Sequence, residues 1–295
     1  MSGAAGGTGT EQPEQPEQAE QPAQAEQPAR SARVWRLTGV LTVVFVLVMG
    51  GAQTLALVAK QQRTEVETYT ESIHKLKLST GSASLRIKAG VQGRVVMRKN
   101  LDWTVSEPGV QVDFVDGVMN VAVQCHRSAP FYNCGAEIEL EVPAGTEVSG
   151  SVTSGAVEVS DLTGGISLDG SSGAINLRRL SGPVRAHTTS GMVEGRDLAS
   201  ARVDVGSVSG SVDLTFASVP QEVKVGTTSG ALEVFVPKGS RYRINSRTGS
   251  GSSDIDRDLG DATSPNSLTA DVGSGALTIG YRSDTPKPPA APTAG

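Results

Sequence analysis

SGAVEVSDL (residues 154–162), SGAINLRRL (172–180) and SGMVEGRDL (190–198) align without a gap, and this repeat decides the fold. Each copy begins with Ser-Gly, and apolar residues follow at alternate positions, as in a half-buried strand. The Ser-Gly pair recurs every 18 to 24 residues as far as residue 275. The pairs are Ser154 and Gly155, Ser172 and Gly173, Ser190 and Gly191, Ser209 and Gly210, Ser229 and Gly230, Ser250 and Gly251, and Ser274 and Gly275.

A second alternating run precedes each pair, so every repeat reads as strand, Ser-Gly corner, strand and connector. One such unit cannot bury its apolar faces alone, whereas stacked units share a continuous interior. The sequence therefore predicts an all-β fold, a β-solenoid of two-strand coils over residues 148–282. A glycine suits the corner if the backbone there adopts positive φ or lies close to the neighbouring coil. The alternative is a β-sandwich of hairpins, although Ser-Gly is not the signal of a tight hairpin turn.

The connectors of the three quoted repeats align as well. Leu162, Leu180 and Leu198 form an apolar row, and the residues immediately before them alternate in charge. These charged residues are Asp161, Arg179 and Asp197. Neighbouring coils lie about 4.8 Å apart, so the alternation predicts ion pairs that keep the coils in register.

Residues 73–147 repeat less regularly and are predicted to form an irregular β cap over the first coil. Strand candidates there lie around residues 75–78, 84–88, 94–98, 118–124 and 136–142. Residues 60–72 are assigned to a linker. Glu-Gln-Pro repeats in residues 1–33 and prolines in residues 283–295 predict disordered tails, because neither segment can bury apolar area.

An uncharged apolar segment, from Leu37 to Ala59, is long enough to cross a bilayer as a helix. We interpret residues 34–59 as an uncleaved transmembrane signal anchor, with cleavage near Gly50 as the alternative. The basic residues around the segment favour a cytoplasmic N-terminus. The expected location is the plasma membrane, with a single span and the main domain outside the cytoplasm.

The only two cysteines, Cys125 and Cys134, lie in CHRSAPFYNC. We predict that they form a disulfide, which agrees with an oxidising, extracytoplasmic compartment. A metal site with His126 as a third ligand is the competing interpretation, but the cysteine spacing matches no zinc motif. No metal or cofactor is therefore expected.

No pattern for catalysis emerges. The two strings nearest to G-x-S-x-G, at residues 206–210 and 226–230, have Val and Thr in place of the nucleophile. His74, His126 and His187 are dispersed, and the Asp254, Asp256, Asp258 run lacks the later residues of a calcium loop. The net charge of -5 with scattered basic residues is unlike that of a nucleic-acid-binding protein.

A mostly acidic column lies three residues after the repeat glycines, on the outward side of the second strand. Its acidic members are Glu158, Glu194, Asp213, Glu233 and Asp254, with Asn176 between the first two. Stacked like charges repel one another, and they attract cations or a basic partner. This column is the candidate binding face, and a merely solubilising role is the alternative.

An apolar N-terminal segment, a paired-cysteine loop, a Val-Pro-x-Gly turn at residues 142–145 and 236–239, and the Ser-Gly repeats occur together. In this combination the chain resembles the bacterial "putative-adhesin" domain family, a DUF-type family of actinobacterial envelope proteins. The resemblance covers residues 70–282 and implies a β-helix-like fold at the cell surface, with no catalytic residues.

Three functions remain open from the sequence. The favoured one is a membrane-anchored adhesin-like interaction module without catalysis, whose partner is an envelope glycan or protein. The others are a structural envelope scaffold that assembles through the ends of the solenoid, and a polysaccharide-active enzyme.

Overall fold

The computed structural model describes residues 39–50, 61–103, 107–124 and 134–283. Contacts divide the chain into two units, residues 1–55 and 56–295, and each is described by itself. In the first unit, residues 39–50 are helical. Within the described ranges, no helix is both long and apolar enough to cross a bilayer. The predicted membrane segment extends outside these ranges, as do both predicted disordered tails.

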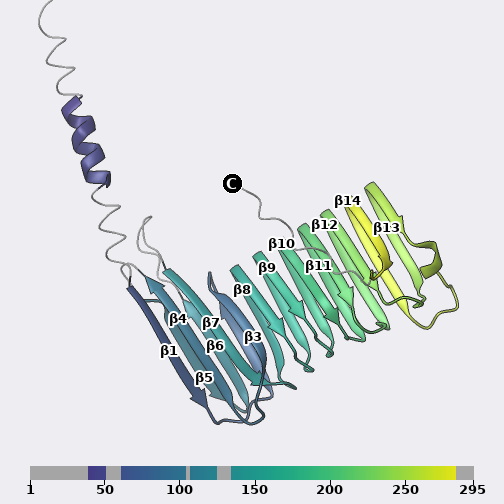
Figure 1. The fold of residues 1–295 in the computed structure, drawn as a ribbon, viewed down its shortest axis with the longest axis horizontal. Coiled ribbons are helices and arrows are strands. Elements are labelled where there is room, and N and C mark those ends of the chain that lie inside the picture. Colours follow the sequence, from purple (N-terminus) through teal and green to yellow (C-terminus); the bar gives the residue numbers. More distant parts are fainter. Residues whose placement is uncertain (1–38, 51–60, 104–106, 125–133, 284–295) are drawn as a thin grey trace, which may run out of the picture. The chain divides into compact units, whose positions relative to one another are not determined.

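The second unit is all-β, as the sequence predicts, and its described strands form one sheet that does not close (Figure 1). Along the chain they are β1 (Gln61–Tyr69), β2 (Lys75–Thr80), β3 (Ser84–Gly90), β4 (Val95–Trp103), β5 (Gly109–Val115), β6 (Val118–Gln124), β7 (Cys134–Pro143), β8 (Glu147–Ser160), β9 (Ile166–Arg178), β10 (Val184–Leu198), β11 (Arg202–Phe216), β12 (Glu222–Val236), β13 (Arg243–Ile255) and β14 (Ser267–Tyr281). One 3₁₀ helix, η1 (Arg257–Leu259), precedes β14.

Each repeat forms one long strand that continues through its Ser-Gly corner. In β8, residues 147–152 pair with β2 and residues 157–160 pair with β3, so the two sides of the corner belong to different ladders. We call the residues before each Ser-Gly the first half of a strand and those after it the second half. Alternate residues of both halves are buried in one shared core. The repeat is therefore a solenoid-like stack of bent strands.

The connectors close the interior. Leu162, Leu180 and Leu198 are each fully buried, so the aligned leucine row lies in the core. Valine, isoleucine and leucine dominate the inward positions of the strands, and their branched side chains suit a pleated, half-buried surface. Burial at about 25 cal/mol per Å² makes this continuous row of apolar side chains the main stabilising term of the stack.

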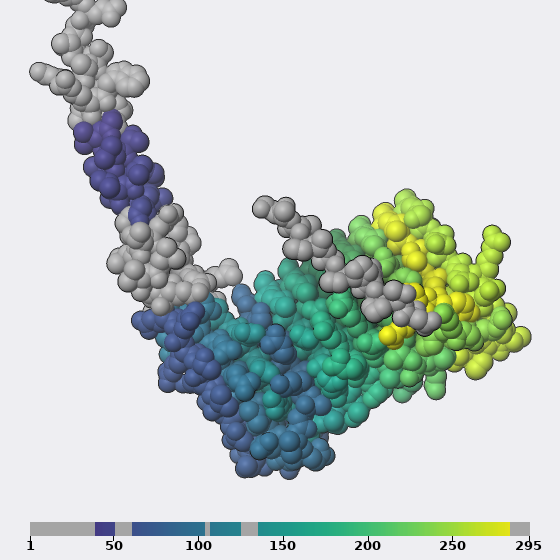
Figure 2. Space-filling model, in the orientation of Figure 1, coloured from purple at the N-terminus to yellow at the C-terminus, as the bar shows by residue number. Residues whose placement is uncertain are grey.

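Strands β8 to β12 stack in chain order, in parallel and in register, as predicted. The last two strands do not follow that order, because β14 pairs with β12 and β13 pairs only with β14. Figure 2 shows the yellow of β14 between the greens of β12 and β13. The expectation that successive repeats stack is therefore wrong for the final pair.

The inward residues of the two strands explain this exchange. In β14, Leu268, Ala270 and Leu277 are buried, whereas Ser246 and Ser253 of β13 occupy the positions paired with the last two. A strand placed inside the stack is covered on both sides, and burying unpaired hydroxyls is costly. The apolar strand therefore takes the inner place, and the polar strand ends the stack.

The cap continues the same stack of strands, but some of its strands run in the opposite direction. Strands β2 and β3 form a coil with its own corner. The Gly81 carbonyl oxygen at this corner accepts a hydrogen bond from the Ser154 amide at 2.7 Å. Strands β6 and β7 pair in parallel with β2 and β3, whereas β4 and β5 run antiparallel to β7 and β6. The irregularity predicted for residues 73–147 is thus a reversal of chain direction.

Residues 60–72, predicted to be a linker, contain strand β1, which pairs antiparallel with β4. Its inward positions carry polar side chains, among them Glu65 and Glu67, so it shows no apolar alternation. These two carboxylates contact Lys99, an inward-facing residue of β4, at 3.0 and 2.6 Å. Backbone pairing with β4 and these ion pairs hold most of the strand, and Tyr69 at its end packs against the core. One inward apolar residue makes no alternating pattern, so the sequence does not reveal the strand.

The corner glycines form a column along the stack. All seven have positive φ, from 121° in Gly173 to 152° in Gly191 and Gly210. A Cβ built on Gly173 would lie 1.9 Å from the carbonyl oxygen of Gly155, and the same clash repeats along the column. Both reasons for a glycine at the corner, the backbone conformation and the close approach, therefore hold.

The charged row of the connectors is present, with one difference. The Arg179 guanidinium forms two hydrogen bonds with the Asp161 carboxylate, at 2.6 and 2.8 Å. Asp197 instead forms an ion pair with Arg282 at 2.7 Å. Asp161, Arg179 and Asp197 also have φ of 63°, 49° and 53°, a conformation that favours glycine and that the sequence did not indicate.

Gly210→Ala should strongly destabilise the protein, because the added methyl group would lie 1.9 Å from the Gly191 carbonyl oxygen at φ of 152°. We expect a loss of several kcal/mol, about 3 or more, in the free energy of unfolding, measured by denaturant titration. The control is Gly165→Ala, where the nearest atom would be 3.5 Å away and φ is not positive. Equal losses in the two variants would contradict the role of the column.

Exchange of both charges, Asp161→Arg with Arg179→Asp, should lower the melting temperature less than either single reversal. Each single reversal leaves like charges at a place where the native pair is 2.6 Å apart. Both side chains are exposed, so the differences should be small. Equal losses for all three variants would argue that this pair contributes nothing to the register of the coils.

Candidate functional site

The serines of the corners form an exposed ladder. Ser154 pairs with Ser172, Ser172 with Ser190, and the series continues through β14 to β13. All seven serines are exposed to solvent. In the described part of the chain no acid–base partner activates them. The ladder therefore marks the bend and provides no nucleophile.

The acidic column predicted as a binding face lies on the outward side of the second halves. Glu158, Asn176, Glu194, Asp213 and Glu233 follow one another on β8 to β12, each opposite the next. Because β14 is inserted, Thr278 separates Glu233 from Asp254 at the end of the column. The column thus reaches the end of the stack with one interruption.

Basic neighbours neutralise much of this column. Glu158 lies 3.4 Å from Arg86 and 3.5 Å from Arg178, and Glu194 forms an ion pair with Arg196. Asp213 and Glu233 also have interaction partners. A stripe of free carboxylates would attract cations, but paired carboxylates have part of that attraction cancelled. The candidate binding face is a mixed-charge surface, and whether it binds a partner stays a prediction.

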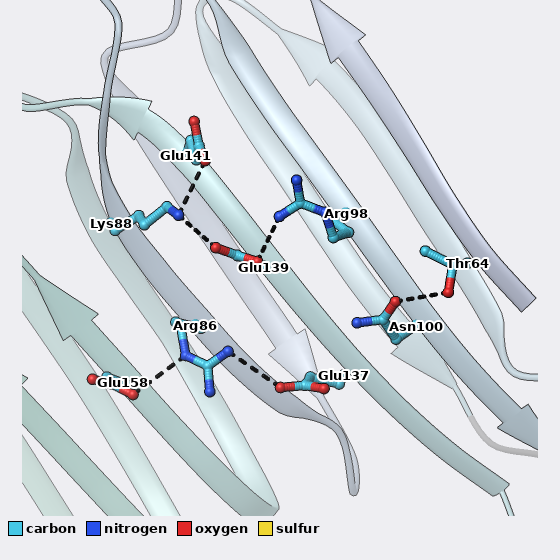
Figure 3. Close-up of polar contacts among 9 residues, drawn as sticks. All are labelled: Thr64, Arg86, Lys88, Arg98, Asn100, Glu137, Glu139, Glu141 and Glu158. Carbon is cyan, nitrogen blue, oxygen red and sulfur yellow. Dashed lines mark hydrogen bonds and ion pairs between the residues drawn. The ribbon is translucent and has the colours of Figure 1, made fainter.

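The same outward surface continues across the cap as a network of alternating charges (Figure 3). Glu139 of β7 lies between Lys88 of β3, at 2.6 Å, and Arg98 of β4, at 2.7 Å. Lys88 also contacts Glu141 at 3.1 Å. Cross-strand pairs of opposite charge stabilise neighbouring strands, so this network holds parallel and antiparallel strands together.

The network shifts the ionisation of its central carboxylate. The hydrogen bond from Lys88 holds the pKa of Glu139 below its usual value, partial burial opposes that shift, and Arg98 lowers the pKa further. The pKa of Lys88 is raised in turn by the hydrogen bonds to Glu139 and Glu141. Both groups are therefore held in their charged forms at neutral pH.

The remaining sequence candidates do not converge. His187 faces outward on β10, with its Nε2 3.2 Å from Asp204 Oδ1, and His74 lies near Gly117 at the other end of the chain. Asp256 caps η1 by accepting a hydrogen bond from the Asp258 amide. Within the described ranges, no three His, Cys, Asp or Glu side chains are placed to hold a metal ion. Cys125 and His126 lie outside those ranges, so the disulfide stays a prediction.

Two hollows lie on the opposite outward surface, that of the first halves. They are shallow and open to solvent, with volumes of about 480 and 660 Å³, and Asp204 and Lys224 line both. The larger hollow extends over β9, β10, β11, β12 and β14. The acidic column of the second halves was the only outward surface predicted from the sequence as a binding face, so this surface was missed.

Residues of both charges surround the larger hollow. The Asp204 carboxylate accepts a hydrogen bond from Arg185 at 2.8 Å, and the Lys224 ammonium lies 2.6 Å from Glu222. The hydrogen bond between Lys224 and Glu222 lowers the pKa of Glu222 and raises the pKa of Lys224. Asp169 and Asp271 lie at opposite ends of the hollow, and within the described residues neither forms an ion pair.

Two glycines form the floor of this hollow. Gly206 and Gly226 face each other on β11 and β12, between His187 and Asp271 in the same register. Each lies four residues before a corner glycine, so their recurrence in consecutive repeats was a signal available in the sequence. The outward surface of the first halves is thus bare of side chains at its centre and charged at its rim.

A family model described as "Toastrack DUF4097" matches residues 57–279, which is most of the chain. No curated protein matches the sequence. The matched range begins before β1 and ends within β14, so it contains the cap and the repeats together.

Solved structures with similar folds have low sequence identity to this chain. A "putative cell adhesion protein" of Clostridium sporogenes is 14% identical over 75% of this chain and 100% of its own, with a TM-score of 0.34. A "putative adhesin" of Bacteroides fragilis is 11% identical over 74% and 97%, with a TM-score of 0.41. A "putative lipid binding protein" of Parabacteroides distasonis is 10% identical over 75% and 97%, with a TM-score of 0.28.

The charge network predicts a specific acid dependence. Glu139→Gln should lower the melting temperature at pH 7 by removing a pair worth on the order of 1 kcal/mol. A lowered pKa contributes stability above the unfolded value of 4.5, and that contribution disappears as pH falls through the folded value. The difference between wild type and variant should therefore shrink below about pH 4.5.

The control for this experiment is Glu147→Gln, because Glu147 is exposed and contacts Lys75 only at 3.6 Å. We expect little difference from wild type at any pH. If the Glu139→Gln difference stayed constant from pH 7 to pH 3, it would not arise from the ionisation of Glu139, and the ion-pair explanation would be contradicted.

Proposed function

The chain belongs to the Toastrack DUF4097 family, and we propose that it is a membrane-anchored, extracytoplasmic binding module without catalysis. Anchoring is supported by the uncharged apolar run of residues 37–59. The extracytoplasmic placement is supported by the basic residues near that run and by the cysteine pair in residues 125–134.

The observation that carries the binding role is the regularity of the outward surfaces. Outward side chains of neighbouring strands from β8 to β14 lie opposite one another, so each surface is a long, regularly spaced array of side chains. A solenoid uses such an extended surface to bind elongated partners. One of these surfaces also contains the hollow of about 660 Å³, which an interaction module can use and a purely solubilising surface does not need.

The absence of catalysis is supported by the chemistry of both surfaces. The carboxylates of the acidic column lie on separate strands, and two of them, Glu158 and Glu194, form ion pairs with basic groups. A glycosidase needs two cooperating carboxyl groups, one of them with a raised pKa. Hydrogen bonds to basic or hydroxyl groups lower the pKa of Glu67, Glu139, Asp161, Glu222 and Asp261, which is the opposite of what a general acid needs. A binding role therefore requires fewer assumptions than a polysaccharide-active enzyme.

Co-sedimentation with insoluble bacterial cell-wall material tests this proposal. The full-length chain, in detergent, should be retained saturably and should release no reducing sugar during prolonged incubation. A carrier protein fused to residues 1–60 is the control, because it has the tail and the apolar segment without the stack. Retention no better than that of the control would contradict the proposal, and steady release of reducing sugar would favour the enzyme.

A further inference from the structure

We propose that the hollow over Gly206 and Gly226 is a saccharide-binding site, which deepens the binding function proposed above and rests on it. The hollow lies on the first-half surface, away from the acidic column, and is centred on β11 and β12. His187 and Asp271 are separated by three strand spacings, or about 14 Å at about 4.8 Å each. That distance accommodates one or two sugar rings lying against the sheet.

The two glycines are not explained by the needs of the backbone. Neither has a φ in the left-handed region, in contrast with the corner glycines. A Cβ on Gly226 would have its nearest neighbour, the Asp271 carbonyl oxygen, at 3.5 Å, which is an ordinary contact. A Cβ on Gly206 would lie 3.1 Å from the ring of His187, a side chain that can move.

Glycine inside a strand has a cost, because it loses more conformational entropy on folding and packs no side chain. The cost recurs here in two adjacent strands, at positions where other residues fit. A bare strand backbone is also found where a ligand or another chain approaches closely, and within the described residues no other segment covers this surface. The glycine floor is therefore best explained by a ligand that lies flat on it.

The rim fits a ligand rich in hydroxyl groups. The Asp271 carboxylate forms no ion pair with a described residue, so its two oxygens are available to accept hydrogen bonds. Lys224 and Thr228, two residues before and after Gly226, provide hydrogen-bond donors on the two sides of the floor. Val208, which is 49% exposed, provides an apolar contact beside them. Sugars offer this combination of paired hydroxyl groups and small apolar patches.

Other ligand classes fit less well. A polyanion would meet Asp169, Asp204 and Asp271, and a basic peptide would meet Lys224 and His187. A drug-like aromatic ligand would find no Phe, Tyr or Trp among the residues that line the hollow. A neutral, hydroxylated ligand avoids each of these mismatches.

The test uses Gly226→Val in the full-length chain, in detergent. Valine suits a strand and has room here, so the melting temperature should be unchanged or higher, whereas its side chain fills the floor. The probe is a panel of neutral and N-acetylated disaccharides, followed by saturation-transfer NMR and calorimetry. We expect wild type to bind at least one of them and the variant to lose about tenfold or more in affinity.

Gly280→Val is the matched control, because Gly280 lies on the second half of β14, away from the hollow and outside the acidic column, and an added Cβ would be 3.7 Å from the Phe235 ring. It should bind as wild type does. Asp271→Asn provides a second variant of nearly unchanged shape, and it should weaken binding without a change in melting temperature. This variant decides the matter if Gly226→Val proves unstable.

Unchanged affinity in Gly226→Val, or in Asp271→Asn where the first variant unfolds, would overturn the saccharide site. Failure of wild type to bind any disaccharide, with oligolysine or inorganic phosphate bound instead, would overturn it as well. Neither result affects retention of the wild type on cell-wall material, so the failure of this site can be distinguished from the failure of the proposed function.

Discussion

Close approach of the corner glycines is the constraint on which the rest of the structure depends. The hydrogen that replaces a side chain on each glycine points toward the carbonyl oxygen of the neighbouring corner glycine, because a Cβ built there would lie only 1.8 to 2.0 Å from it. For Gly155, at the start of the column, the neighbour is Ala83, at 2.4 Å. Contacts of the Cα–H···O type are weak, on the order of 0.5 to 1 kcal/mol each. Their repetition matters more than their strength, since one larger residue would push two coils apart.

The glycine column also explains why the repeats tolerate insertions. The spacing of the Ser-Gly pairs grows from 18 to 24 residues along the chain. Pairing of corner with corner fixes the register of both halves, so additional residues can be accommodated only in the connectors. Inside the bend, the Ser207 and Thr227 hydroxyls donate to the carbonyls of Gly191 and Gly210. These two hydroxyls are thereby satisfied inside the apolar bend. Thr80 and Thr248, which occupy the same position near the two ends of the stack, have buried hydroxyls without a hydrogen-bond partner among the described residues.

Sequence alone was sufficient for the features that repeat. Ser-Gly recurrence locates the corners, alternate apolar residues locate the interior, and gapless alignment locates the leucine row. It was insufficient for features that depend on which strands are neighbours. Glu158 and Arg86 are 72 residues apart, so this ion pair follows only from the pairing of β3 with β8. The hollow was missed for a different reason: glycine recurs four residues before two successive corners, but a glycine inside a strand does not by itself indicate a binding surface.

The two ends of the stack bear on which surfaces are available for function. A solenoid end that exposes an apolar interior and unpaired strand edges invites another copy to stack on it. Here the last strand, β13, has Ser246, Thr248 and Ser253 at inward positions, and the first strand of the cap, β1, has Glu65 and Glu67. Stacking a second copy would bury hydroxyls at one end and, along β1, carboxylates at the other, each at a cost. The other edge strand of the cap, β5, has Val110, Val112 and Phe114 at its inward positions, so the polar edge at that end is confined to β1.

Polar terminal strands therefore disfavour growth through the ends and leave the lateral surfaces for recognition. The exchange of β13 and β14 also shapes the lateral surface. It places an apolar strand against β12 and extends the hollow to Asp271. Had the repeats stacked in chain order, Arg247 would occupy the place opposite Gly226, since it pairs with Asp271 in the observed register. A cation would then stand where the structure has a carboxylate, so the order of the last two strands determines the charge at that rim.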